Sequence, residues 1–146
     1  MRRYEFVGHI ADARMKISGD SLEELFAAGM EGMFEFAKTG CCSDFATPNP
    51  PAGGEGRVSE IIKITSADTT ALLVDFLSEL LTLSHEKKAV FCRVKFMKLT
   101  ETELEAEVSG APVDSFDEDI KAVTYHEANI VKTPSGVYET NIVFDI

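Results

Sequence analysis

The sequence lacks several features that would place a protein in a familiar class. No apolar run approaches the roughly 18 residues that a membrane span needs. Neither phosphate-binding motif, G-x-x-x-x-G-K-[ST] or G-x-G-x-x-G, occurs, and there is no G-x-S-x-G nucleophile elbow. These absences argue against a membrane-spanning protein, a nucleotide-binding enzyme of those types and an α/β-hydrolase.

Basic residues are also scarce. The chain has 14 lysines and arginines against 25 aspartates and glutamates, a formal net charge of −11. This charge repels phosphate backbones, so a cation or a basic protein partner is favoured over direct nucleic-acid binding. The 146 residues, 45% of them hydrophobic, predict one soluble domain over 1–146. No hydrophobic segment follows "MRRYEF", so we expect no secretory signal and a cytosolic location.

Cysteines are few, and their spacing is uninformative. Cys41 and Cys42 are adjacent, Cys92 lies far away in sequence, and no C-x-x-C occurs. Neither a zinc site nor a disulfide framework is indicated. We therefore predict reduced thiols that behave as small apolar residues.

Two segments carry helix signals. Ser21 and Glu24 form a capping-box pattern, and apolar residues then recur at helical spacing, which predicts a helix over 21–38. A second helix, capped by Ser66 or Asp68, carries a wide leucine-rich stripe. Both stripes are typical of core rather than of a binding groove.

The rest of the chain favours strands. A stretch rich in proline and glycine, 41–56, predicts a surface loop, and "TPSG" predicts a hairpin turn. The expected fold class is α+β, a mostly antiparallel β-sheet arrangement of about seven strands packed against two α-helices. The predicted strands are 4–8, 13–17, 57–65, 89–99, 102–109, 120–133 and 137–146.

Carboxylates are the remaining candidates for chemistry. Asp12 ends the first strand-like segment and Asp145 interrupts the closing one. Terminal strands often pair because chain termini often lie close together. Together with the α-carboxylate of Ile146 they would form a cluster of anions that protonation or a bound cation must relieve. Oxygen ligands suit Ca²⁺, Mg²⁺ or Mn²⁺. The alternative is that both aspartates are simply solvated strand ends.

The roles of three further residues each allow two interpretations. Lys121 is either a charge that protects an edge strand or a counter-ion of an acidic site. His9 and His126 could support a metal site, or could make ordinary hydrogen bonds at a turn and on a strand.

Five motifs together resemble the archease family, in their order and over nearly the whole chain. They are "GHIAD" at 8–12, "GDSLEELFAAGMEGMF" at 19–34, "LLVDFLSELL" at 72–81, "KAVTYHE" at 121–127 and the final "VFDI". The chain departs from the family pattern at Gly8, where an acidic residue is common, at Ile10, which replaces threonine, and at Asp119-Ile120, which replaces Glu-Val.

The resemblance implies a specific role. It implies a divalent metal held by Asp12 and Asp145, a functional basic residue at Lys121, and motif positions without an assigned role at His9 and His126. Archeases are non-catalytic accessory proteins of the GTP-dependent RNA ligase that joins tRNA halves and repairs RNA with 3′-phosphate ends. They promote guanylylation of the ligase, so the implied partner is the ligase. The resemblance implies contact with RNA only through the ligase, and no contact with a membrane.

Two other functions stay open at this point. A metal-dependent hydrolase could use a carboxylate-held cation to activate water. A chaperone-like protein-binding module would instead bind exposed apolar segments and be indifferent to metal.

Overall fold

The structure, a computed structural model, describes residues 2–7, 12–42 and 57–146, which form two antiparallel sheets and two helices. The five-stranded sheet runs in the order β1 (Arg3–Val7), β2 (Asp12–Gly19), β8 (Tyr138–Asp145) and β6 (Ala122–Thr124), with β7 (Val131–Lys132) also pairing with β8. The three-stranded sheet runs in the order β3 (Val58–Thr65), β5 (Glu103–Pro112) and β4 (Ala89–Leu99). The predicted α+β class is confirmed.

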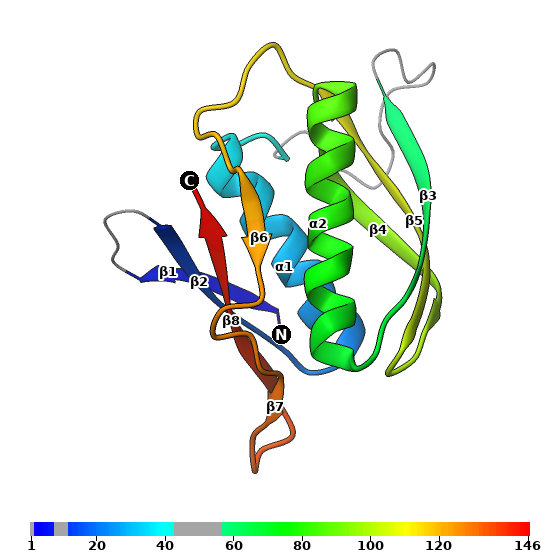
Figure 1. The fold of residues 1–146 in the computed structure, drawn as a ribbon. Coiled ribbons are helices and arrows are strands. Elements are labelled where there is room, and N and C mark those ends of the chain that lie inside the picture. The colour runs from blue at the N-terminus through cyan, green and yellow to red at the C-terminus, as the bar shows by residue number, and fades with distance from the viewer. Residues whose placement is uncertain (1, 8–11, 43–56) are drawn as a thin grey trace.

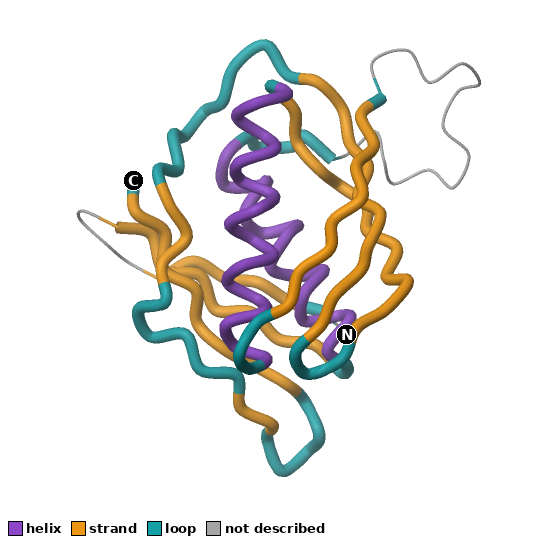
Figure 2. The backbone as a smooth tube through the Cα atoms, turned by 45° about the vertical axis from the view of Figure 1, so that its right-hand side comes forward, coloured by secondary structure: helices purple, strands orange, loops and turns teal. Residues whose placement is uncertain are grey.

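The helices α1 (Leu22–Ala37) and α2 (Thr69–Lys87) fill the space between the two sheets. Helix α1 contacts β2 of one sheet and β4 of the other, while α2 contacts β6 on one side and β3 and β4 on the other. Figures 1 and 2 show the two helices side by side with strands around them. Neither helix is long and apolar enough to cross a membrane, and no other helix of the described residues is. The core is shared by helices and sheets, and its largest buried side chains include Phe26, Phe34, Phe76, Phe91 and Phe144.

Helix α1 starts and stops where its sequence signals predict. The Ser21 hydroxyl accepts a hydrogen bond from the Glu24 backbone N–H at 3.1 Å. The Glu24 carboxylate accepts from the N–H of Asp20 at 3.0 Å, one residue earlier than the capping-box pattern predicts. The helix ends at Ala37 with Lys38 as its C-cap. Gly40 then has a φ of 74°, which a residue without a Cβ adopts at little cost.

Helix α2 is capped by Asp68, the second of the two predicted candidates. Its carboxylate accepts from the Ala71 N–H at 2.8 Å. The other candidate, Ser66, instead donates its hydroxyl to Asp75 at 2.6 Å. Asp75 also accepts a hydrogen bond from the Tyr125 hydroxyl, which raises the pKa of Tyr125 and ties α2 to the segment after β6.

The predicted strand over 120–133 is wrong as a single element. It divides into β6 and β7, because a turn in which the Ala128 N–H donates to the Tyr125 carbonyl at 3.1 Å interrupts it. Glu127 in this turn has a φ of 62°, a left-handed conformation that a strand does not contain. The hairpin predicted at "TPSG" is confirmed, with Gly136 at a φ of 88°.

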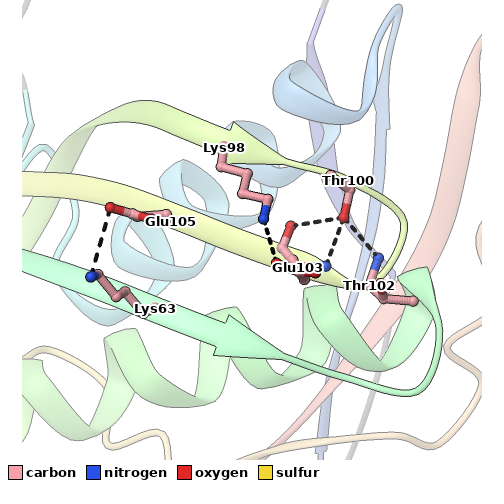
Figure 3. Close-up of polar contacts among 6 residues, drawn as sticks. All are labelled: Lys63, Lys98, Thr100, Thr102, Glu103 and Glu105. Atoms are coloured by element: carbon pink, nitrogen blue, oxygen red, sulfur yellow. Dashed lines mark hydrogen bonds and ion pairs between the residues drawn. The ribbon is translucent and has the colours of Figure 1, made fainter.

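Charged pairs cover the outer face of the three-stranded sheet (Figure 3). Lys63 lies 3.9 Å from Glu105, and Lys98 donates to Glu103 at the end of the β4–β5 hairpin. The Thr100 hydroxyl closes this hairpin by accepting from the Glu103 N–H at 2.9 Å. Exposed ion pairs add little stability, so their main effect is to keep this face solvated.

The cysteines differ from the prediction of reduced thiols. Cys42 and Cys92 form a disulfide, and their Cα atoms lie 5.4 Å apart. The contact arises because α1 packs against β4, which brings the end of the helix to a strand 50 residues later. Spacing along the sequence carries no sign of this tertiary contact. Of the predicted loop 41–56, only Cys41 and Cys42 lie within the described residues.

Cys41 stays a free thiol beside this disulfide. Its sulfur lies 3.4 Å from that of Cys42, and its S–H donates to the Phe34 carbonyl at 3.5 Å. Burial, helped by the negative charge of Glu35, raises the pKa of Cys41 to about 11. Because the thiolate is the attacking form in disulfide exchange, the raised pKa slows attack by Cys41 on the Cys42–Cys92 bond at neutral pH.

Candidate metal centre on strands β2 and β8

The first and last long strands of the five-stranded sheet bring the two predicted aspartates together. In the antiparallel pairing of β2 with β8, Asp12 lies directly opposite Asp145, and Ala13 lies opposite Phe144. Figure 1 shows β8 ending beside β2 and β6. The predicted convergence of these two segments is therefore present.

The alternation of side chains decides where the two carboxylates point. Ala13 and Phe144 are fully buried against the helices, so their neighbours Asp12 and Asp145 lie on the opposite, outer face of the sheet. A slip of β8 by one residue would turn Ile142 and Phe144 outward and Asp145 inward. Losing the burial of two such side chains costs about 1.5–3 kcal/mol each, which fixes this register.

The two carboxylates form an uncompensated pair of negative charges. Directly opposed residues of an antiparallel pair have Cβ atoms roughly 4.5–5.5 Å apart, and like charges in this position repel. Asp12 is half-buried and Asp145 is exposed. Among the described residues, neither side chain has an ion-pair or hydrogen-bond partner. This arrangement offers oxygen ligands from two strands to a cation, with room for water.

The nearest cation on the same strand is engaged elsewhere. Arg14 follows Asp12 by two positions on the same outer face, and its Nε lies 2.6 Å from the Glu127 carboxylate. The Nε–H is not aligned on that oxygen, so the contact is a charge pair without a hydrogen bond. Because Glu127 takes up the charge of Arg14, this arginine does not neutralise Asp12. The alternation of side chains along β2 is enough to place Arg14 beside Asp12. The pairing of Arg14 with Glu127 depends on the turn after β6, which the alternation does not predict.

The backbone of Lys121 lies next to Asp145. Its N–H donates to the Asp145 carbonyl at 2.7 Å, and the following residue, Ala122, lies opposite Asp145 across β6 and β8. The Lys121 side chain is exposed. Within the described part of the chain its ammonium makes no ion pair with either aspartate.

Of the other predicted site residues, one lies outside the described residues, one lies away from the two aspartates and one is adjacent to Asp145. His9 lies outside the described residues. His126 is exposed beyond the end of β6 that leads away from Asp145, and its backbone N–H donates to the Thr124 hydroxyl at 3.3 Å. Ile146 directly follows Asp145, and its side chain is partly buried against the core.

Fold and site together define a class of protein: an acidic α+β domain with two antiparallel sheets around two helices and an outward pair of carboxylates on neighbouring strands. The model of the archease protein family (MTH1598/TM1083) matches residues 4–146. The chain belongs to the archease family.

Relatives and solved structures agree with this assignment. Protein archease of Thermococcus gammatolerans is 32% identical over 100% of both chains. Protein archease of Methanosarcina acetivorans is 31% identical over 99% of this chain and 97% of its own. The solution structure of Methanobacterium thermoautotrophicum protein 1598 has the same fold, with a TM-score of 0.69 at 24% identity over 98% of both chains.

A second solved structure shares the fold as well. The crystal structure of an archease from Thermotoga maritima, described there as a possible chaperone, has a TM-score of 0.63 at 22% identity. The match covers 96% of this chain and 94% of that one.

Proposed function

We propose that a hard divalent cation, Ca²⁺, Mg²⁺ or Mn²⁺, binds between the carboxylates of Asp12 and Asp145, with the carboxylate of Ile146 as a further oxygen ligand. The observation that carries this proposal is the direct opposition of Asp12 and Asp145 on one face of the sheet. Two uncompensated carboxylates are the ligand type that such cations prefer, and water can complete the shell on an exposed face.

The metal-loaded protein acts as a non-catalytic activator of the GTP-dependent RNA ligase that joins tRNA halves and repairs RNA with 3′-phosphate ends. Membership of the archease family and the resemblance of its motifs support this partner. The net charge of −11 supports it too, because an acidic domain can dock on a basic RNA-binding face of a ligase. RNA is then met only through the ligase.

The site contributes to guanylylation of the ligase by positioning charge. A cation held through a few carboxylates keeps coordination positions that the phosphates of GTP can occupy. Lys121, whose backbone is hydrogen-bonded to Asp145, supplies a positive charge beside the same phosphates. When bound, such a cation would supply, together with Lys121, positive charge that stabilises the negative charge on the phosphates as the ligase takes up GMP.

A guanylylation assay tests this function. We expect the purified ligase with GTP to form ligase–GMP faster in the presence of this protein, and a chelator titration to remove the stimulation. Asp12→Asn and Asp145→Asn keep the side-chain volume but weaken the metal site, so they should lower stimulation by about 10-fold or more at limiting metal.

The control is Asp114→Asn, which removes an exposed carboxylate from a loop away from these strands and should stimulate like the wild type. Circular dichroism of each variant confirms that the fold is intact. Full stimulation by Asp12→Asn and Asp145→Asn at limiting metal would refute the proposed role of the site.

A chaperone-like function is the second candidate, and two observations favour it. The Thermotoga relative is described as a possible chaperone, and this chain exposes Tyr4 and Phe6 on the edge strand β1. The test is whether this protein suppresses the aggregation of an unfolded client protein. Suppression that persists in the presence of a chelator, and in Asp12→Asn and Asp145→Asn, would support that function. Release of product from a substrate panel without ligase would instead indicate the metal-dependent hydrolase.

A further inference from the structure

The three cysteines converge on one point of the structure, apart from the carboxylate pair. Cys41 and Cys42 follow α1, Cys92 lies in β4, and their sulfur atoms all lie within 4.8 Å of one another. We propose that, once the Cys42–Cys92 disulfide is reduced, the three sulfurs form a binding site for a thiophilic cation such as Zn²⁺ or Cu⁺.

The third sulfur is what distinguishes this cluster from an ordinary disulfide. A disulfide needs only Cys42 and Cys92, yet the Cys41 sulfur lies 3.4 Å from that of Cys42. Zinc bonds thiolate sulfur at about 2.3 Å with tetrahedral angles, which places ligand sulfurs roughly 3.8 Å apart. The Cα atoms of Cys42 and Cys92, 5.4 Å apart, allow their sulfurs to reach such a separation without a change of backbone.

The ligand type selects the class of cation. Thiolate ligands favour Zn²⁺, Cu⁺ and other soft ions over Ca²⁺ or Mg²⁺. Zn²⁺ would need a fourth ligand besides the three sulfurs, whereas Cu⁺ is satisfied by three thiolates. This site is therefore chemically different from the carboxylate site on β2 and β8, which suits hard cations.

Reduction and metal binding are coupled. A dithiol reductant transfers two electrons and two protons to the Cys42–Cys92 disulfide and becomes a disulfide itself, leaving three free thiols. Binding of the cation as a tris-thiolate then releases the three thiol protons. The disulfide and the bound cation use the same two sulfurs, so each state excludes the other.

The cluster has a route to solvent. Cys92, although 8% exposed, lines a surface pocket of about 650 Å³ between α1 and β4. Glu23, Ala27 and Arg93 are among the other residues of its wall. Cys41 and Cys42 are partly exposed, so a cation or a reductant can reach the cluster from solvent.

A cadmium titration tests the proposal, since Cd²⁺ bound to thiolates gives an ultraviolet charge-transfer band. The full chain, reduced and kept without oxygen, should bind about one Cd²⁺ per chain with this band. The oxidised chain should show no band. Cys41→Ser still forms the Cys42–Cys92 disulfide, which non-reducing mass spectrometry verifies. After reduction it should bind Cd²⁺ about 100-fold more weakly, because changes outside the ligand shell already cost 10- to 100-fold.

Competition identifies the natural type of cation. Displacement of Cd²⁺ by Zn²⁺ or by Cu⁺ supports the site and shows which ion it prefers, and the loaded chain should resist reoxidation to the disulfide. Absence of the band in the reduced chain, or equal Cd²⁺ affinity of wild type and Cys41→Ser, would overturn the proposal.

Discussion

Gly110→Ala should lower the free energy of unfolding by about 3 kcal/mol or more, because the added methyl group has no space. Gly110 lies in the central strand β5 and pairs with Phe91 on one side and Val58 on the other. A Cβ at this position would lie 1.7 Å from the carbonyl oxygen of Val90 and 2.8 Å from the Cα of Phe91. These are backbone atoms, so relief requires β4 and β5 to separate.

Urea unfolding of the variant measures this effect. Separation of the strands would also move the buried Phe91 ring, which packs against Phe34 with ring centroids 5.9 Å apart. Ser109→Ala, the neighbouring position in the same strand, is the control and should stay within about 0.5 kcal/mol of the wild type. A Gly110→Ala protein as stable as this control would show that β4 and β5 do not approach as closely as the structure has them.

Reduction of the Cys42–Cys92 disulfide should lower the free energy of unfolding by about 4 kcal/mol in the chain-entropy account. The bond closes a loop with a sequence separation of 50 residues, and the unfolded chain regains the freedom of that loop when the bond breaks. Urea unfolding with and without a dithiol, in the presence of a metal chelator, measures the difference.

Cys92→Ala is the control for reduction, because the dithiol has no disulfide to open in this variant. Its unfolding curve should be the same in both conditions. Identical curves for the wild type with and without dithiol would contradict the prediction and mean that the bond does not constrain the unfolded chain.

Local signals in the sequence predict much of the fold because their physical causes are local. Ser21 and Asp68 cap the helices through hydrogen bonds that span three residues. The alternation Ala13, Met15, Ile17 is enough to tell which face of β2 is buried, and it places Asp12 on the other face. The candidate carboxylates were therefore accessible from sequence, together with the family motifs that contain them.

Contacts that depend on tertiary packing were not accessible. The Cys42–Cys92 bond exists because α1 packs on β4, and no spacing rule along the chain expresses that contact. The division of the strands into two sheets also depends on tertiary packing. Hydrophobic periodicity shows which face of a strand is buried, but it does not show which other strand pairs with it. The interruption of 120–133 depends on the left-handed conformation of Glu127, a residue type with no strong preference for it.

The charge pairing around the two aspartates also could not be predicted from the sequence. Arg14 is two residues from Asp12, and proximity alone suggests that it neutralises this carboxylate. In the structure it pairs with Glu127 instead, which leaves Asp12 and Asp145 as uncompensated anions. That pairing supports the proposal that the two strands hold an external cation rather than an internal ion pair.

Calorimetric titration of Mn²⁺ and Ca²⁺ into the wild-type chain and into Asp145→Asn tests the metal site most directly. We expect about one cation to bind to the wild type, with an affinity at least about 10-fold lower in Asp145→Asn and unchanged in Asp114→Asn. Equal binding by the wild type and Asp145→Asn, or no binding by either, would show that the opposed carboxylates of β2 and β8 do not hold a metal.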